Sequence, residues 1–148
     1  MEYKILDVKD IPSMKELVIE GFRQFSYKTL KDFIKTPNHY GFIAKDDDIV
    51  VGLCYGHLLK RPDNKNASVF YIFSLGVLDD FQNQGVGTHL LTFVKDFAFE
   101  KLNVSKCFWT TEKTNIQAHS VYNKLANVNE DEIIYVAKNK NPKHKIRS

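Results

Sequence analysis

Residues 71–88 read YIFSLGVLDDFQNQGVGT, and this stretch decides the fold. Its first half ends an apolar run, residues 67–78 (ASVFYIFSLGVL), which predicts a strand covered on both faces. Its second half is a turn that contains Gly85 and Gly87. An amphipathic helix is expected after the turn, because one face collects apolar residues at helical spacing: Val86, Leu90, Val94, Phe97 and Ala98.

A glycine turn that opens a helix is suited to binding an anion. The first N–H groups of a helix have no partner within it, and the helix dipole adds positive partial charge at this end. Gly85 and Gly87 lack a Cβ, so a pyrophosphate can approach the main chain closely. The alternative is a turn that simply requires glycine. A P-loop is excluded by Thr88 and His89, and a dinucleotide fingerprint by Leu90, where a third small residue is needed.

The rest of the chain predicts more strands and helices around this unit. Strands are expected over residues 3–8, 40–45, 49–60, 105–111 and 132–137, and helices from 13 to about 22, over 29–35 and over 114–126. Ser13 with Glu16, and Thr114 with Gln117, have the spacing of capping boxes. This order of elements predicts a mixed α/β protein with a central sheet.

Composition narrows the class of protein further. The chain has 148 residues, 43% of them hydrophobic, which fits one domain with a real core. No apolar run reaches membrane-span length and the N-terminus lacks a signal-peptide pattern, so we expect a cytoplasmic protein. Cys54 and Cys107 are interpreted as buried thiols rather than a disulfide or a metal site, because CxxC spacing is absent.

Charge separates the body of the chain from its end. Residues 138–148 hold Lys138, Lys140, Lys143, Lys145 and Arg147 and no acid. Of the 21 basic and 18 acidic side chains, 16 and 18 remain in residues 1–137, a balance of −2. We therefore expect a domain over residues 1–137 and a basic tail over 138–148. The tail is either a solvated terminus or a contact to an acidic partner or nucleic acid.

Three motifs, in order, resemble the Gcn5-related N-acetyltransferase (GNAT) family. Residues 82–87 (QNQGVG) match its acetyl-CoA loop, Gln/Arg-x-x-Gly-x-Gly/Ala, and residues 75–77 (LGV) match its preceding Leu-x-Val. Asn115, Ala118 and residues 122–125 (YNKL) resemble its Asn…Ala…Tyr-x-Lys-Leu segment. The resemblance covers residues 1–137 and is strongest over 71–125, where it looks most like the aminoglycoside 3-N-acetyltransferase branch. It implies a mostly antiparallel twisted sheet flanked by helices, with strands splayed at the acetyl-CoA site.

The resemblance also implies roles for individual residues. The main chain of residues 75–77 would pair with pantetheine like an added strand, and the N–H of Val77 would stabilise the developing oxyanion. Tyr122 would protonate the leaving thiolate, although packing beside Leu125 is the alternative. The implied acetyl-CoA-binding set is Leu75, Gly76, Val77, Gln82, Asn83, Gln84, Gly85, Val86, Gly87, Thr88, Asn115, Tyr122 and Lys124, and no metal is expected.

The acceptor side is less defined by the sequence. Many relatives carry an acid near the position of Ser74, but here none lies between Asp63 and Asp79. Water, Glu112 or His119 would then take the proton of the amine. Glu130 and its acidic neighbours would attract a cationic acceptor, or form a solvated loop. Early aromatic residues shape an acceptor wall or belong to the core: Phe22, Phe25, Tyr27, Phe33 and Tyr40.

Together these features predict an acetyl-CoA-dependent N-acetyltransferase. Direct transfer to a primary amine of a small molecule is expected, with a polyamine or an aminoglycoside among the cationic candidates. The alternatives are a non-catalytic acyl-CoA-binding module, suggested by the missing acid near Ser74, and a protein N-acetyltransferase. Acetyl-CoA and an amine are the expected partners, without membrane or nucleic acid. Members of the family are often dimers, so a homodimer is implied.

Overall fold

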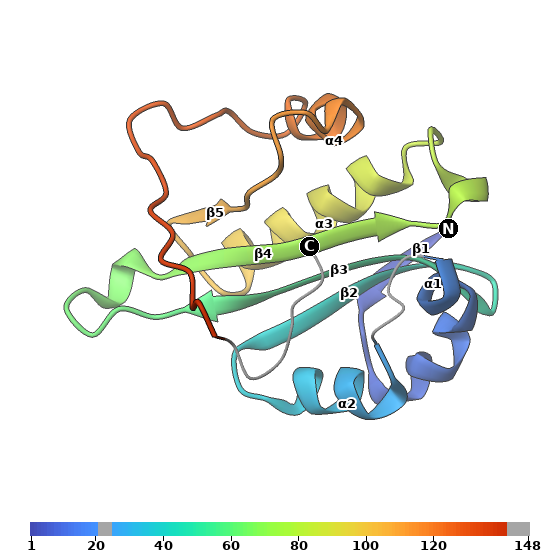
Figure 1. Cartoon of the computed structure of the whole chain (residues 1–148). Coiled ribbons are helices and arrows are strands. Elements are labelled where there is room, and N and C mark those ends of the chain that lie inside the picture. Colours follow the sequence, from blue (N-terminus) through green and yellow to red (C-terminus); the bar gives the residue numbers. More distant parts are fainter. Residues whose placement is uncertain (21–24, 142–148) are drawn as a thin grey trace.

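The computed structural model describes residues 1–20 and 25–141 and contains one five-stranded sheet (Figure 1). The strands are β1 (Glu2–Ile5), β2 (His39–Asp46), β3 (Ile49–Leu59), β4 (Val69–Val77) and β5 (Lys106–Phe108). The helices are α1 (Lys15–Glu20), α2 (Tyr27–Lys35), α3 (Val86–Glu100) and α4 (Ile116–Tyr122). The strands lie in the order β1-β2-β3-β4-β5. The predicted mixed α/β fold is confirmed.

Helices cover both faces of the sheet and give it two cores. Helices α1 and α2 lie against one face, and α3 lies against the other with α4 beside it (Figure 1). Leu53 of β3 belongs to the core on the α2 side, whereas Phe42 of β2 and Phe70 of β4 belong to the core on the α3 side. The predicted apolar stripe of α3 is confirmed, because Leu90 and Val94 are fully buried. Each such side chain contributes roughly 1.5–3 kcal/mol by leaving water.

The strands part between β4 and β5. Strands β1 to β4 pair antiparallel, while β5 runs parallel to β4 and pairs only with residues 69–71. Beyond Tyr71, the side of β4 that faces away from β3 has no partner strand in the described part of the chain. We call this side, over residues 72–77, the open edge of β4. The splayed arrangement that the family resemblance implied is thus present.

A β-bulge shapes the middle of β4. Tyr55 lies opposite Ser74, but its neighbour Gly56 lies opposite Ile72, so Phe73 is an extra residue in β4. The two strands approach so closely here that a Cβ at Gly56 would lie 2.1 Å from the carbonyl oxygen of Tyr71. Position 56 therefore requires glycine, and the bulge fixes how Ser74 is presented.

The helix starts differ from those predicted. The first helical segment begins as a 3-10 helix at Val8, well before the expected cap at Ser13, and leads directly into α1. The Asp10 carboxylate accepts a hydrogen bond from the N–H of Asp7 (3.1 Å), and this interaction starts the helix early. Strand β1 consequently ends at Ile5 rather than at residue 8. Phe22, expected within this helix, lies outside the described residues.

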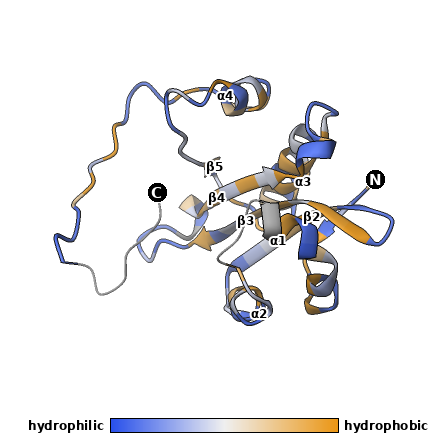
Figure 2. Ribbon diagram, turned by 45° about the vertical axis from the view of Figure 1, so that its right-hand side comes forward, coloured by the Kyte–Doolittle hydropathy of each residue, from blue (hydrophilic) through white to orange (hydrophobic). Residues whose placement is uncertain are grey.

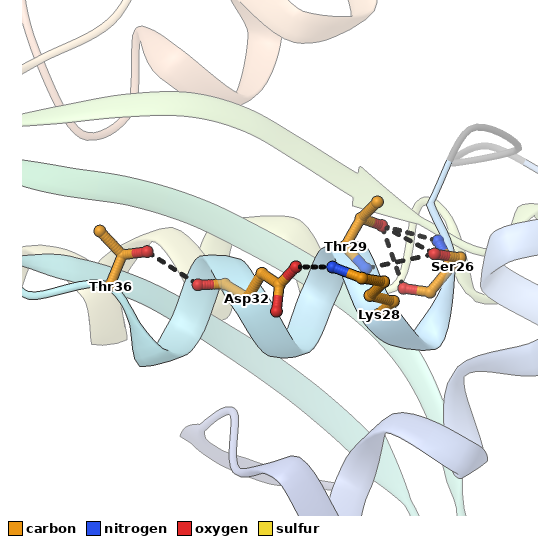
Figure 3. Close-up of polar contacts among 5 residues, drawn as sticks. All are labelled: Ser26, Lys28, Thr29, Asp32 and Thr36. Carbon is orange, nitrogen blue, oxygen red and sulfur yellow. Dashed lines mark hydrogen bonds and ion pairs between the residues drawn. The ribbon is translucent and has the colours of Figure 1, made fainter.

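Helix α2 starts two residues before the predicted position, at Tyr27. Ser26 caps it, because the Ser26 hydroxyl accepts from the N–H of Thr29 (3.2 Å) and the Thr29 hydroxyl accepts from the N–H of Ser26 (2.8 Å) (Figure 3). At the other end, the hydroxyl of Thr36 donates to the carbonyl oxygen of Asp32 (2.8 Å). These contacts fix both ends of α2 over the sheet.

The final predicted strand, over residues 132–137, is wrong. These residues are extended but pair with no strand that the structure describes, and their side chains are exposed, Tyr135 to 89%. In Figure 2 this segment runs away from the sheet, with hydrophobic colour along part of it. Strand composition alone is insufficient, since a strand requires a neighbouring edge with free N–H and C=O groups. The predicted strand over residues 105–111 likewise forms only over Lys106–Phe108.

Two further findings concern the body of the protein. Both cysteines are free thiols, with Cys54 buried and Cys107 half-buried, as the sequence predicted for Cys54. Among residues 1–20 and 25–141, no helix combines the length and the apolar composition needed to cross a membrane.

In the basic tail, Lys138 and Lys140 are exposed, whereas Lys143, Lys145 and Arg147 lie outside the described residues.

Replacing Gly56 with alanine tests the bulge. We expect G56A to lower the free energy of unfolding by about 1–3 kcal/mol, because its Cβ would overlap the Tyr71 carbonyl oxygen. Urea unfolding followed by circular dichroism measures the loss. The matched control is G52A in the same strand, where the nearest contact of a Cβ would be an ordinary 3.4 Å. Equal losses for the two variants would contradict the close approach at the bulge.

Candidate active site

The turn between β4 and α3 has the geometry of an anion site. Gly85 directly precedes α3 in the left-handed region, at φ +83°, which favours glycine. The first hydrogen bond of the helix runs from the N–H of His89 to the carbonyl oxygen of Gly85 (2.9 Å). The N–H groups of residues 86–88 come before it and have no acceptor within the helix. They point out of the helix start, where the dipole also favours negative charge.

The start of α3 packs against the end of β4. A Cβ on Gly87 would lie 3.8 Å from Cγ2 of Val77 and 3.9 Å from Cδ2 of Leu75. The contact places the free N–H groups of the helix next to the last residues of β4. The predicted anion site and the predicted pantetheine strand are therefore neighbours.

The main chain of β4 offers hydrogen-bonding groups along its open edge. The N–H of Leu78 donates to the carbonyl oxygen of Val51 on β3 (2.8 Å). Because N–H groups alternate in direction along a strand, those of Val77 and Leu75 point away from β3. The carbonyl oxygen of Val77 points the same way and accepts from the side-chain amide of Gln82 (3.0 Å). A ligand in extended conformation can pair with this edge.

Gln82 connects the parts of the site. Its amide nitrogen donates to the Val77 carbonyl oxygen (3.0 Å) and to the Asp79 carboxylate (3.2 Å). Its amide oxygen accepts from Nε2 of Gln117 on α4 (3.1 Å). Gln84 makes a similar contact within the loop, from its Nε2 to the Asp80 carbonyl oxygen (3.0 Å). The side chain of Gln82 thus holds the loop and α4 together.

Helix α4 carries two of the predicted site residues, one at each end. Asn115, not Thr114, caps the helix, because its Oδ1 accepts from the N–H of Ala118 (3.1 Å). The capping box predicted at Thr114 is therefore wrong: the Asn115 amide takes over the cap. At the far end, Nζ of Lys95 donates to the carbonyl oxygen of Leu125 (2.7 Å) and ties α4 to α3.

Tyr122 is half-buried at the end of α4. Its ring packs edge-on against Trp109, 5.5 Å between centroids, and it borders the core on the α3 side together with Leu125. Burial raises the pKa of the Tyr122 phenol above 10.0, and the nearby Cys54 thiol raises it further. The phenol is therefore protonated at neutral pH. The packing that was the alternative role of Tyr122 is therefore present, and the phenol still carries a proton that it can donate.

The predicted acceptor residues do not form a cluster. Ser74 lies at the bulge and hydrogen-bonds the side chain of Tyr55. Glu112 and Glu130 are exposed, the first before α4 and the second after it, and Lys124 is exposed as well. No hydrogen bond or ion pair within residues 1–20 and 25–141 joins Ser74, Glu112 and Glu130 to one another. The same part of the chain holds no group of three or more metal-ligating side chains.

The side chain of His119 hydrogen-bonds to the main chain just before α4. Its Nε2 lies 3.0 Å from the carbonyl oxygen of Glu112 and 3.1 Å from that of Lys113. Carbonyl oxygens only accept hydrogen bonds, so this nitrogen carries the proton and donates it. The contact favours the packing interpretation of His119 over a role as general base.

Sequence reasoning missed an aromatic cluster on the α2 side of β3 and β4. Phe73 packs against His57, 4.7 Å between ring centroids, and stacks on Tyr55 at 5.9 Å. Nδ1 of His57 lies 3.3 Å from Nε2 of His39. Burial and His39 lower the pKa of His57, so this imidazole is neutral at pH 7. The alternation of Tyr55 and His57 along β3 was the available signal, because such residues share one face.

A cavity lies between α2 and the sheet next to this cluster. Its volume is about 210 Å³. Helix α2 and the residues just before it supply one wall, and β2, β3 and the chain after β1 supply the other; the lining residues are Leu6, Phe25, Thr29, Leu30, Phe33, Gly41, Leu53 and Tyr55.

The aromatic residues predicted to shape an acceptor wall take three positions. Phe25 and Phe33 line the cavity. Tyr27 is 50% exposed. Tyr40 is in the opposite core, where its ring packs against Phe97 at 5.4 Å. Phe22 lies outside the described residues.

A helix start with unpaired N–H groups beside a parted pair of strands is the arrangement that the GNAT resemblance implied. The model of the acetyltransferase (GNAT) family matches residues 8–126, so the chain belongs to this family. The resemblance seen in the sequence is confirmed. No curated protein sequence matches the chain.

Solved structures share the fold at low sequence identity. An aminoglycoside acetyltransferase, meta-AAC0020, from an uncultured soil metagenomic sample aligns with a TM-score of 0.77 and 22% identity, over 93% of this chain and 95% of that one. The ribosomal-protein-alanine N-acetyltransferase from Brucella melitensis biovar Abortus 2308 aligns with a TM-score of 0.75 and 16% identity, over 93% and 99%. These likenesses establish the fold, and the acceptors of the two proteins differ.

Proposed function

We propose that the protein is an acetyl-CoA-dependent N-acetyltransferase that acts by direct transfer on the primary amine of a small molecule. One observation carries the proposal: the free N–H groups at the start of α3 lie beside the open edge of β4. The family to which the chain belongs supports the same reaction class. We also propose a cytoplasmic location and a homodimer, on the family resemblance.

In this proposal, the main chain holds the donor. The N–H groups of residues 83–88 bind the pyrophosphate, with Gln82 keeping the loop in place. Residues 75–77 pair with the pantetheine arm through the open edge of β4. Asn115 can still donate from its amide nitrogen to the same arm, because only its oxygen is used in the helix cap. Lys124 is exposed at the end of α4 and is proposed to contact the donor from there.

The transfer step then needs two groups of the chain, the N–H of Val77 and the phenol of Tyr122. The amine nitrogen forms a bond to the thioester carbonyl carbon, while the N–H of Val77 stabilises the negative charge on the carbonyl oxygen. The carbon–sulfur bond breaks and Tyr122 gives its proton to the thiolate. The amine loses its proton to water, for which Glu112 and His119 are alternatives with little structural support. The proton that leaves the amine restores the phenol of Tyr122 through the solvent, so a neutral amine and acetyl-CoA give the amide and CoA thiol with no proton left over.

A second candidate function is an acyl-CoA-binding module without transfer. The observation in its favour is that Ser74, at the position where many relatives carry an acid, bonds to Tyr55 and not to a carboxylate. Calorimetry with acetyl-CoA, followed by an assay of CoA release over a panel of amines, separates the candidates. Binding without release of CoA for any amine or peptide N-terminus would favour the module, and release only with peptides would favour a protein N-acetyltransferase.

Substitution of Gly85 tests the pyrophosphate site. We expect G85V to weaken CoA binding at least about tenfold, because a β-branched residue resists the left-handed conformation that aligns the N–H groups. The matched control is G85N, since asparagine tolerates this conformation better. Isothermal titration calorimetry measures both. Equal affinity of G85V and the unaltered protein would remove this turn from the site.

Substitution of Tyr122 tests the acid. We expect Y122F to lower kcat at least about tenfold and to leave the Kd for acetyl-CoA nearly unchanged, because the ring still packs on Trp109 while the proton donor is gone. On the alkaline side, activity of the unaltered protein should fall at a higher pH than an ordinary tyrosine pKa would give, since burial raises the pKa of Tyr122 and only the protonated phenol can act as the acid. Steady-state kinetics and calorimetry provide the readouts. An unchanged kcat would leave Tyr122 with packing alone.

A further inference from the structure

The cavity between α2 and the sheet has an apolar wall. Of its eight lining residues, only Thr29 and Tyr55 carry polar side-chain atoms. The Thr29 hydroxyl donates to the carbonyl oxygen of Ser26 (3.0 Å) and accepts from the N–H of Ser26 (2.8 Å), so it is already engaged in the helix cap (Figure 3). The Tyr55 side chain bonds to Ser74. A ligand inside the cavity therefore meets mainly carbon.

The size of the cavity limits what fits. An apolar cavity of about 150 Å³ accepts benzene. At about 210 Å³, this cavity has room for one aromatic ring and a short aliphatic arm. A multi-ring sugar amine is much larger than this volume.

The cavity leads to the reaction site. Tyr55 lies between Phe25 and Phe33, with ring centroids 5.4 and 5.5 Å away. The same tyrosine bonds to Ser74, which directly precedes Leu75 at the open edge of β4. A molecule whose ring fills the cavity can therefore extend its arm past Tyr55 towards the bulge of β4.

Charge in this region suits one amine rather than several. No lining residue is an acid. Asp32, on α2, pairs with Lys28 at 2.6 Å on the solvent side, and the buried Asp10 pairs with Lys4 at 3.0 Å. Because each carboxylate already pairs with a lysine, neither is available to bind the extra ammonium groups of a polyamine. Near the bulge, the rings of Tyr55 and Phe73 stack on each other, and aromatic rings of this kind can bind a single ammonium group.

We infer that the acceptor is a monoamine with one aromatic or similarly sized apolar group, carried on a short arm. The apolar group occupies the cavity beneath α2, and the arm directs the amine nitrogen to Ser74 and the open edge of β4. The inference rests on the proposed function and narrows its acceptor, replacing the polyamine and aminoglycoside candidates.

The test compares three amines with acetyl-CoA at saturation: 2-phenylethylamine, spermidine and sisomicin. We expect kcat/KM for 2-phenylethylamine to exceed that for each of the other two at least about tenfold. Filling the cavity with L30F should lower kcat/KM for 2-phenylethylamine about tenfold without changing the Kd for acetyl-CoA. The matched control L30M, which conserves volume, should retain activity within about threefold. A preference for spermidine or sisomicin, or an L30F variant as active as L30M, would overturn the inference.

A binding measurement separates this inference from the proposed function. Calorimetry of 2-phenylethylamine with the unaltered protein and with L30F reports on the cavity without any turnover. Loss of the binding heat in L30F supports the cavity even if acetyl-CoA does not bind, in which case the proposed function alone fails. Absence of 2-phenylethylamine binding to a protein that binds acetyl-CoA would overturn the inference and leave the proposed donor site standing.

Discussion

The separation of β4 from β5 beyond Tyr71 is the constraint on which the site depends. Continued pairing would occupy the N–H groups of Leu75 and Val77, and the edge would have nothing left to bind a ligand. Because the strands part, the edge stays available at the point where α3 begins and where its first N–H groups are also unused. The side-chain amide of Gln82 then donates a hydrogen bond to the carbonyl oxygen of Val77 and holds the turn in place. In the proposed donor site, backbone groups make most of the contacts, so few side chains need to be specified.

The sheet also divides the chemistry between its two faces. Tyr122 approaches from the α3 side, where burial keeps its proton in place. The cavity and the aromatic cluster are on the α2 side, and the bulge at Phe73 turns Ser74 towards Tyr55. Gly56 permits this bulge because a side chain there would meet the Tyr71 carbonyl. An acceptor and a leaving group can thus approach the open edge of β4 from opposite directions.

The sequence predicts those structural features that residues close together in the chain determine. The periodicity of α3, the hairpin of β2 and β3 and the glycine turn were recognised because each is encoded within about 20 residues. Helix starts at Ser13 and Thr114 were misplaced because Asp10 and Asn115 accept the hydrogen bonds that start these segments, from the N–H groups of Asp7 and Ala118. The strand expected over residues 132–137 does not form, because these exposed residues do not lie against any sheet edge that the structure describes. The cavity beneath α2 joins segments around residues 6, 25–33, 41 and 53–55, which no local pattern links.

The hydrogen bond between Gln82 and Gln117 connects the turn before α3 to α4. Since Lys95 fixes the other end of α4, a shift of that helix changes the position of Tyr122 and strains the turn at the same time. Thermodynamic linkage is reciprocal, so whatever orders the turn also orders the helix. Amide hydrogen exchange in α4 should therefore slow when an anion such as inorganic pyrophosphate occupies the turn.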